Sequence, residues 1–356
     1  MTRSLRNNLL VLAALAALVT GIEQSILAQS APALGTVERI VVHGKSLEGN
    51  LNGDPVERPV FVYLPPSYKT QPNRRYPVVY LLHGYGLRAE RWMTLFRIEN
   101  GANQAMTGAG GGVGGGERAR EMIVVNPDAY SLYDGSFYSN SATAGDWETF
   151  IGTDLVAHID SHYRTLAKRE SRGLAGHSMG GYGALRIGMK RPDAFASLYL
   201  MAAAGMMERG EPSEAMTTAA GFTTREQVAA LRYPNKSTLA RAAAWSPNPQ
   251  NPPFFVDLPV GKDGMARPEI QAKWLANSLL PMLDQYAAGL KRMTAIKFDV
   301  GTADGLLAGN RQLDAAMTQG GIAHVFETYD GDHNNRIAER IEKHVLPFFS
   351  TRLEFD

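Results

Sequence analysis

Short runs of β-branched and aromatic residues recur along the chain, and most are followed by stretches with helical spacing. These runs predict eight strands. The first two alternate apolar and polar positions, as in an edge with one solvated face, whereas the later ones are mostly continuous, as in strands covered on both faces. The predicted strands cover residues 37–43, 58–65, 76–84, 121–127, 171–176, 196–203, 295–302 and 323–329.

Helical spacing fills most of the intervals, over residues 147–163, 182–190, 310–319 and 335–349. Alternation of strand and helix predicts right-handed crossovers and a mostly parallel eight-stranded sheet flanked by helices, with the first two strands as an antiparallel edge. Residues 206–290 interrupt this rhythm with polar, alanine-rich and proline-rich segments and a predicted helix over 268–291. We interpret them as a cap-like insertion between the sixth and seventh strands of a single α/β domain, residues 29–356.

The first residues have the pattern of a secretory signal. Arg3 and Arg6 precede an apolar run over residues 9–19, and small and polar residues follow it. A membrane-spanning helix needs about 20 apolar residues, so the shorter run favours a cleaved signal peptide over a retained anchor. Residues 1–28 are the expected signal peptide, with cleavage after Ala31 or Ala33 as alternatives. We therefore expect a protein that is secreted or periplasmic.

Composition excludes several kinds of function. Without residues 1–28 the formal charge changes from +1 to zero, because two arginines and one glutamate are lost, so nothing favours nucleic acid as a partner. The chain has no cysteine, which excludes disulfides, thiolate catalysis and cysteine-ligated zinc.

Two further motifs are interpreted as non-functional. The glycine-rich segment 108–116 precedes a predicted strand, whereas a dinucleotide-binding loop follows one, so we interpret it as a surface loop. His158 and His162 lack the glutamate of a zinc-protease motif. We expect no metal and no organic cofactor.

One short segment, Gly176-His177-Ser178-Met179-Gly180, lies between a predicted strand and a predicted helix. It fits the small-x-Ser-x-small pattern of a nucleophile elbow, where the chain reverses so tightly that bulky side chains two residues from the serine would clash. Ser178 is therefore the predicted nucleophile, a structural turn being the alternative, and His177 is expected to point elsewhere.

A serine hydroxyl attacks only when a base removes its proton. His333 is the predicted base, because it lies in a loop between the last strand and the last helix, at the edge of the sheet where active sites gather. Asp304 directly follows the seventh strand and is the predicted acid that orients His333. Asp330 and Asp332 lie closer to His333 in sequence and are interpreted as turn residues.

Two backbone amides are needed to stabilise the oxyanion of an acyl-transfer intermediate. The residue after the nucleophile, Met179, supplies one, and Tyr85 in the glycine-containing loop after the third strand is the expected second. His83 in that loop is interpreted as structural. Aromatic residues of the loops are candidates for contact with an acyl or aryl group, with packing as the alternative for each; we select Trp147, Tyr138 and Phe254.

Several segments together resemble the "Putative esterase" family of α/β-hydrolases, over residues 37–350. They are "YLLHGYG", "VVNPDA", "WETFIGTDLVAHIDSHYRT", "GLAGHSMGGYGAL", "DVGTADGLL" and "YDGDHN". The family includes feruloyl and acetyl xylan esterases, S-formylglutathione hydrolases, siderophore trilactone esterases and mycolyltransferases of the antigen 85 type. The resemblance implies an α/β-hydrolase fold, a triad of Ser178, Asp304 and His333, and an oxyanion hole formed by Tyr85 and Met179.

The expected function is that of an exported serine carboxylic-ester hydrolase that forms an acyl-enzyme. Its expected substrates are feruloyl or acetyl esters of plant polysaccharide, or other small esters. Three alternatives stay open. In an acyltransferase of the antigen 85 type, an alcohol instead of water attacks the acyl-enzyme. A serine peptidase would need help for an amide leaving group, and a non-catalytic envelope or binding protein would retain only the fold. Residues 206–290 match none of the quoted family motifs.

Overall fold

A computed structural model describes residues 33–108, 118–231 and 235–356. The expected signal peptide, residues 1–28, and nearly all of the glycine-rich segment 108–116 lie outside the described residues. Leu34–Asp356 form one compact unit. Within the described residues no helix is both long and apolar enough to cross a membrane.

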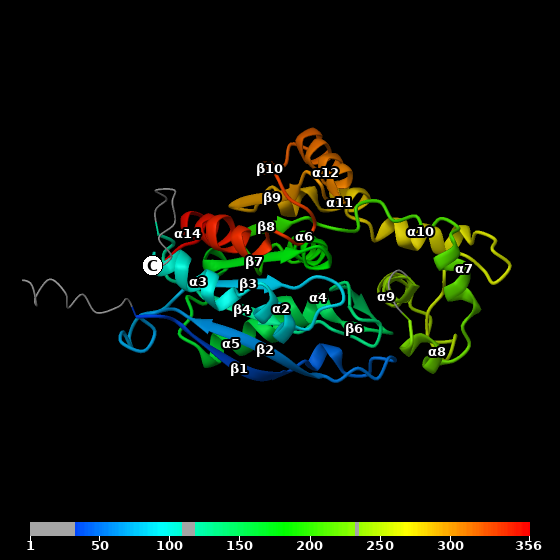
Figure 1. Ribbon diagram of the computed structural model, residues 1–356, viewed down its shortest axis with the longest axis horizontal. Helices are drawn as coiled ribbons and strands as arrows, with labels where there is room; N and C mark the ends of the chain where they lie inside the picture. Colours follow the sequence, from blue (N-terminus) through cyan, green and yellow to red (C-terminus); the bar gives the residue numbers. More distant parts are fainter. Residues whose placement is uncertain (1–32, 109–117, 232–234) are drawn as a thin grey trace, which may run out of the picture. The chain divides into compact units, whose positions relative to one another are not determined.

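Among the described residues, one sheet of eight strands contains every strand that the hydrophobic pattern predicts (Figure 1). The strand β2 pairs antiparallel with β1 and with β4, and all other pairs are parallel. This confirms the predicted antiparallel edge. In spatial order the strands are β1 (Thr36–His43), β2 (Glu57–Leu64), β4 (Ile123–Pro127), β3 (Val78–Leu82), β7 (Arg172–His177), β8 (Ser197–Met201), β9 (Ala295–Gly301) and β10 (Val325–Tyr329).

The central strands are buried on both faces. In β3, Val78, Tyr80 and Leu82 belong to one core. Val79 and Leu81 belong to the other. Burial on both faces explains the continuous apolar runs, and each fully buried aliphatic side chain contributes about 1.5–3 kcal/mol of hydrophobic free energy. Close packing on both faces thus holds the central strands in place.

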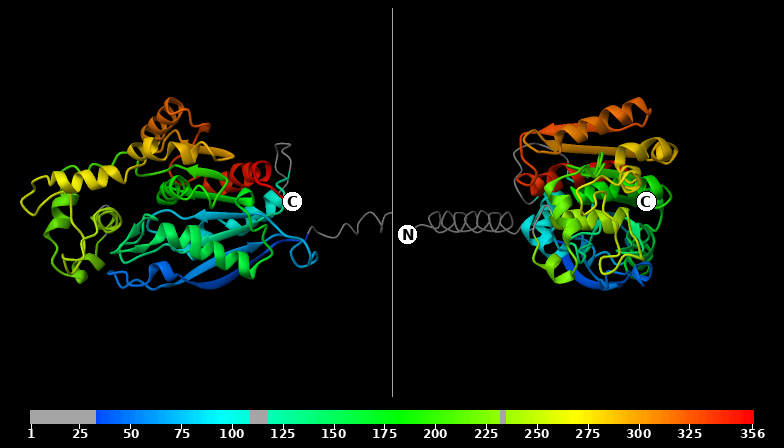
Figure 2. Two further views of the ribbon diagram at one scale, coloured as in Figure 1. Left: turned by 180° about the vertical axis from the view of Figure 1, so that it is seen from behind. Right: turned by 90° about the vertical axis from the view of Figure 1, so that its right-hand side faces the viewer.

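Helices cover both faces of this sheet (Figures 1 and 2). One core is covered by α4 (Trp147–Thr149), the π-helical turn η2 (Phe150–Asp154), α5 (Leu155–His162), α6 (Met179–Lys190), α11 (Leu279–Leu290) and α12 (Leu307–Gln319). The other is covered by α2 (Ala89–Leu95), α3 (Ile98–Thr107), α13 (Ile337–Arg340), the π-helical turn η4 (Ile341–Val345) and α14 (Leu346–Arg352). Short elements complete the fold: the 3₁₀ turns η1 (Lys45–Leu47) and η3 (Arg169–Ser171) and a hairpin of β5 (Asn140–Ser141) and β6 (Gly145–Asp146).

The insertion lies between β8 and β9 in the chain, the sixth and seventh strands of the sheet. Its helices α7 to α10 gather at one end of the sheet, and α11 returns along it (Figures 1 and 2). The core on that side continues into the insertion, where it includes Met216, Leu239 and Trp274. The first four helices are α7 (Glu214–Gly221), α8 (Arg225–Ala229), α9 (Asn235–Trp245) and α10 (Pro268–Ala276).

The single helix predicted over residues 268–291 is wrong, because α10 ends at Ala276 and α11 begins at Leu279. Tertiary hydrogen bonds occupy the break. The Ser278 hydroxyl accepts from the Glu208 amide at 2.7 Å, and the Leu279 amide donates to the Gly205 carbonyl at 2.9 Å. Long-range partners therefore replace the helical bonds that the local pattern favours.

Candidate active site

The serine of the predicted elbow lies between the last residue of β7 and the first residue of α6. Its backbone has φ 57° and ψ −113°, a positive φ that non-glycine residues adopt only where the surroundings enforce it. The Ser178 amide donates to the Met201 carbonyl on β8 at 2.9 Å, and its carbonyl accepts from the Tyr182 and Ala204 amides at 3.0 and 3.1 Å. Hydrogen bonds to neighbouring elements thus hold the strained residue.

The glycines of the elbow have no room for a side chain. A Cβ atom at Gly176 would lie 2.2 Å from the Gly180 carbonyl oxygen, and one at Gly180 would lie 2.1 Å from the Leu82 carbonyl oxygen. Both distances are far below van der Waals contact, and both obstacles are backbone. The crossing of β3, β7 and α6 therefore requires glycine at these positions, which is the pattern seen in the sequence.

The structure brings the three residues of the predicted triad together. His333 Nδ1 lies 2.7 Å from Asp304 Oδ2, and His333 Nε2 lies 3.0 Å from Ser178 Oγ. An ionised carboxylate only accepts, so Nδ1 carries the proton and Nε2 accepts from the hydroxyl. The residues follow β7, β9 and β10, parallel strands whose carboxyl ends share one edge of the sheet.

Asp304 is held in place by two donors. Its side chain is 1% exposed, against 33% for His333, and its Oδ1 accepts from the Leu306 amide at 2.8 Å. Burial acts to raise the pKa of Asp304, but the hydrogen bonds from His333 and Leu306 outweigh it, and the pKa lies below its usual value. Asp332 instead accepts from the Asn334 and Asn335 amides, each at 2.8 Å, which confirms its predicted turn role.

The loops that carry the acid and the histidine touch through their backbones. A Cβ atom at Gly301 would lie 2.2 Å from the Gly331 carbonyl oxygen. Gly301 is the last residue of β9, three residues before Asp304, and Gly331 precedes His333 by two. The approach of the two loops is therefore set by direct contact of main chain with main chain.

His177 has a positioning role that the sequence reasoning missed. Its Nε2 donates to the His333 carbonyl at 2.8 Å, and its ring packs against those of Trp92 and His333, at centroid distances of 6.1 and 4.6 Å. Burial, followed by the charge of His333, lowers the pKa of His177 to about 3. A neutral ring with its proton on Nε2 thus fixes the backbone of His333. The only signal for this in the sequence is its place beside Ser178.

The loop after β3 runs beside the serine. A Cβ atom at Gly84 would lie 3.5 Å from Ser178 Cβ, which places the next residue, Tyr85, close to the elbow. The Met179 amide opens α6, where backbone N–H groups and the helix dipole favour negative charge. Both predicted oxyanion residues therefore adjoin Ser178.

His83 has the structural role expected from the sequence. Its Nε2 accepts from the Ala129 amide at 2.9 Å, so its Nδ1 carries the proton and donates to the Gly84 carbonyl at 2.9 Å. Burial lowers the pKa of His83, which keeps the ring neutral. The ring thereby ties the oxyanion loop to the segment after β4.

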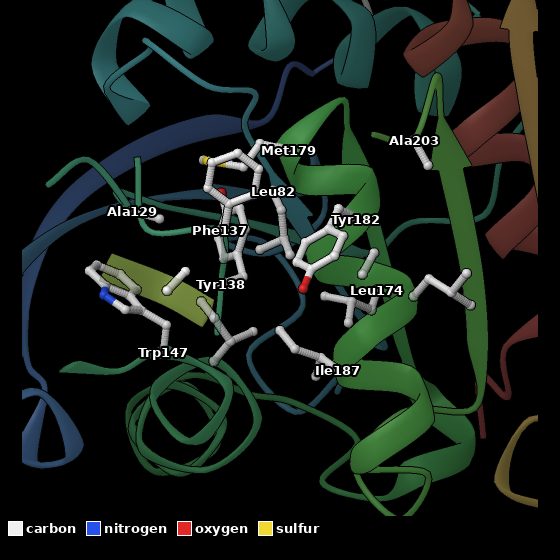
Figure 3. Close-up of a cluster of buried hydrophobic side chains, with 14 of the residues drawn as sticks. Leu82, Ala129, Phe137, Tyr138, Trp147, Leu174, Met179, Tyr182, Ile187 and Ala203 are labelled. Carbon is white, nitrogen blue, oxygen red and sulfur yellow. The ribbon is translucent and has the colours of Figure 1, made fainter. Parts of the chain in front are cut away.

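Two of the three predicted substrate contacts lie in the core. Trp147 and Tyr138 are 0% exposed, and both stand in the buried cluster of Figure 3. The Trp147 indole N–H donates to the Ala144 carbonyl at 2.8 Å, and the Tyr138 hydroxyl donates to the His83 carbonyl at 3.1 Å. We correct both predictions, because a fully buried ring with its polar atom bonded presents no surface to a ligand.

The third predicted contact, Phe254, lines a cavity of about 280 Å³ inside the insertion. Neither Ser178 nor His333 lines this cavity. Within the described residues no three histidine, aspartate or glutamate side chains gather in a way that would hold a metal ion. The rings of His158 and His162 stack on each other on α5, with their centroids 4.1 Å apart.

The eight-stranded sheet, with its helices on both faces and a serine at the strand–helix elbow, has the α/β-hydrolase fold. Within that class the chain belongs to the "Putative esterase" family, whose model matches residues 55–337.

Individual relatives agree with this membership. The chain is 34% identical over 142 residues to Esterase MT1326 of Mycobacterium tuberculosis (strain CDC 1551 / Oshkosh); the match covers 39% of this chain and only 27% of that protein. A ferulic acid esterase structure aligns with a TM-score of 0.63 at 23% identity, over 90% of this chain and 99% of that one. An S-formylglutathione hydrolase from Agrobacterium tumefaciens aligns with a TM-score of 0.60 at 18% identity, over 92% and 98%. At these sequence identities, the likeness to the two structures shows that this chain shares their fold and shows nothing further.

Proposed function

We propose that the protein is a serine carboxylic-ester hydrolase that acts through an acyl-enzyme. The observation that carries this proposal is the unbroken chain of hydrogen bonds from Ser178 through His333 to Asp304. The strained backbone of Ser178 aims its hydroxyl out of the elbow toward His333, and the buried carboxylate of Asp304 holds the imidazole in the tautomer that a base requires.

In the first half-reaction, His333 Nε2 takes the proton of Ser178 as Oγ bonds to the ester carbonyl carbon. The carbonyl π electrons move onto oxygen, and the amides of Met179 and Tyr85 stabilise that oxyanion. Collapse of the tetrahedral intermediate breaks the bond to the alcohol oxygen, which leaves with the proton from His333. The acyl group stays on Ser178.

In the second half-reaction, water replaces the alcohol. His333 takes a proton from water as the oxygen attacks the acyl carbon, and returns it to Ser178 Oγ when the carboxylic acid leaves. Asp304 stabilises the imidazolium that forms in each half, and a carboxylate with a pKa below its usual value stays ionised throughout.

For the substrate we propose small esters, with feruloyl and acetyl esters of plant polysaccharide tested first. The support is the resemblance of the sequence motifs to esterases of this kind. We also propose that residues 1–28 direct export and are removed. The mass of the protein purified from outside the cytoplasm should then correspond to a chain that begins at residue 29, 32 or 34, and the mass of the full-length chain there would contradict export by a cleaved signal.

The deciding experiment combines turnover with active-site labelling. Purified protein should hydrolyse nitrophenyl esters of short chain length, methyl ferulate or acetylated xylan, and should be labelled by a fluorophosphonate. Ser178→Ala should abolish both, whereas Ser213→Ala, at the start of α7 in the insertion, should alter neither. Wild-type protein with no ester cleavage and no label would refute the proposal. Full activity in Ser178→Ala would refute the assigned nucleophile.

A further inference from the structure

The segment between β4 and β5 is strained next to the elbow. Three of its non-glycine residues have positive φ: Asp134 at 66°, Phe137 at 49° and Tyr138 at 43°. Side chains disfavour this region, so such residues persist only where surrounding contacts hold them. Tyr138 and Phe137 are buried in the core. Asp134 is not, and other contacts must fix it.

This strained segment packs against the loop after β3. The Tyr85 hydroxyl donates to the Tyr133 carbonyl at 2.9 Å, and the Gly86 amide donates to the Asp134 carbonyl at 3.0 Å. A Cβ atom at Gly135 would lie 2.6 Å from Met179 Sδ and 2.8 Å from the Tyr85 ring. Residues 133–135 thus pack directly on both residues whose amides we assign to the oxyanion.

The side chain of Asp134 joins this segment to the insertion. Its Oδ1 accepts from Lys236 Nζ at 2.7 Å, and Lys236 lies in the first turn of α9. The Tyr130 hydroxyl donates to the same oxygen. Burial, followed by the hydrogen bond to Asp134, raises the pKa of Tyr130 to about 12, so the hydroxyl remains a donor. The side chains of Lys236 and Asp134 are only 11% and 22% exposed, and salt screens such a pair weakly.

We propose that Asp134 and Lys236 are positioning residues through which the insertion holds the oxyanion loop in register with Ser178. The backbone of Asp134 holds Gly86, and its carboxylate is held by α9, so one residue transmits the placement of the insertion to the loop that carries Tyr85. This inference rests on the proposed function, because the position of that loop affects turnover only if Ser178 forms a tetrahedral intermediate.

The experiment compares Asp134→Asn, Lys236→Met and the double variant. Asparagine tolerates positive φ and can still accept from Tyr130, so Asp134→Asn removes the charge and keeps the turn. Lys236→Arg, unlike Lys236→Met, keeps a positive charge at this position. Lys190→Met is the matched control, since it breaks a lysine–carboxylate pair of 2.6 Å with Glu148. That pair lies at the far end of α6, about 16 Å along the helix from Met179.

Two readouts separate positioning from simple stabilisation. One is the division of the effect between kcat and KM for a nitrophenyl ester. The other is inhibition by an alkyl boronic acid, in which a bond forms between Ser178 Oγ and boron, the hydroxyl proton passes to His333, and the tetrahedral boronate anion places one of its hydroxyl oxygens in the oxyanion hole. Thermal melting of each variant reports stability separately.

Lys236→Met and Asp134→Asn should each lower kcat about tenfold with KM unchanged, a fraction of what loss of a whole oxyanion donor causes. Boronic acid affinity should fall by the same factor, the double variant should match the single ones, and Lys236→Arg should recover most of kcat. Lys190→Met should leave kcat unaltered. Melting shifts without a change in kcat, or additive effects in the double variant, would overturn the inference while hydrolysis by wild type upholds the proposed function. A wild type that neither hydrolyses esters nor is labelled would overturn both.

Discussion

The elbow at Gly176–Gly181 and the insertion over residues 206–290 are built in opposite ways. In the elbow, backbone lies directly on backbone, and a single added carbon at Gly176 or Gly180 would come within 2.2 Å of main-chain atoms. The insertion is joined to the rest of the unit partly through individual side chains. Arg225 donates to the Leu51 and Asn52 carbonyls at 2.9 Å each, and Lys236 reaches Asp134.

The two regions therefore differ in how precisely they fix the positions of their residues. At the elbow, close packing of main chain on main chain allows only one backbone conformation. It can therefore place the catalytic groups with the sub-ångström precision that the chemistry needs. In the insertion, each polar anchor contributes modestly and can be exchanged without loss of the others. We therefore expect changes at the catalytic edge of the sheet to be severe, and comparable changes in the insertion to be mild.

The largest effect is expected at the triad acid. Asp304→Asn keeps the shape of the side chain but removes the charge that fixes the tautomer of His333, and kcat for a nitrophenyl ester should fall by about 10⁴-fold. Asp257→Asn, which changes the same residue type in the insertion, should alter kcat less than about twofold. Steady-state kinetics, with circular dichroism to check folding, measures both. Similar losses of kcat at the two positions would show that the catalytic edge and the insertion are equally sensitive to such changes.

Glycine-to-alanine substitutions compare the two regions directly. Gly180→Ala forces a methyl group against the Leu82 carbonyl, and should lower the free energy of unfolding by about 3 kcal/mol or more. At Gly221, the last residue of α7, nothing lies within 4 Å of an added Cβ. Gly221→Ala should raise the free energy of unfolding by about 0.5 kcal/mol, because alanine loses less backbone entropy in a helix. Urea denaturation measures both; a stable Gly180→Ala variant would show that the crossing can relax.

Acid should destabilise the catalytic edge. The pKa of His177 is about 3 in the folded chain against an ordinary value near 6.5, so the unfolded chain binds the proton more readily. Stability from this group is complete above pH 6.5 and declines as the pH falls toward 3, by up to about 1.4 kcal/mol per pH unit.

Urea denaturation at pH 7.5 and pH 5 tests this effect. His177→Gln keeps an N–H that can bond the His333 carbonyl but does not titrate, and should lose about 2 kcal/mol less than wild type over this interval. Residues 206–290 contain no histidine. An equal loss in wild type and variant would place the acid sensitivity elsewhere.

A small loss of stability is expected at an anchor of the insertion. Arg225→Met removes the hydrogen bonds to Leu51, Asn52 and Pro253, but water can satisfy the freed carbonyls, so the free energy of unfolding should fall by about 1 kcal/mol. Limited proteolysis should show faster cleavage within residues 206–290, with kcat near that of wild type. Loss of kcat comparable to that of Asp304→Asn would show that the insertion is as tightly coupled as the elbow.

The same contrast explains what could be predicted from the sequence. All eight strands were predicted, because each has a local pattern: continuous apolar runs in the central strands, which are buried on both faces, and alternation of apolar and polar residues in the first two. The places of Ser178, Asp304 and His333 followed from a second local rule, since loops after parallel strands meet at one edge. Each inference needed only the residues next to the one in question.

Errors arose where partners are distant in sequence. The break between α10 and α11 depends on bonds from Glu208 and Gly205, about 70 residues away. Trp147 and Tyr138 have the residue types of a binding pocket, yet their rings fill the core. The positioning role of His177 could not be deduced from its place beside Ser178, because it depends on the carbonyl of His333, 156 residues further on.

The contact between Gly301 and Gly331 has a consequence for how far this sequence can vary. Any side chain at 301 would push the Asp304 loop away from the His333 loop and lengthen the hydrogen bond between them. Selection for activity would therefore retain glycine there as strictly as it retains the triad. A survey of tolerated substitutions would count Gly301 among the catalytic residues, although it has no side chain with which to react.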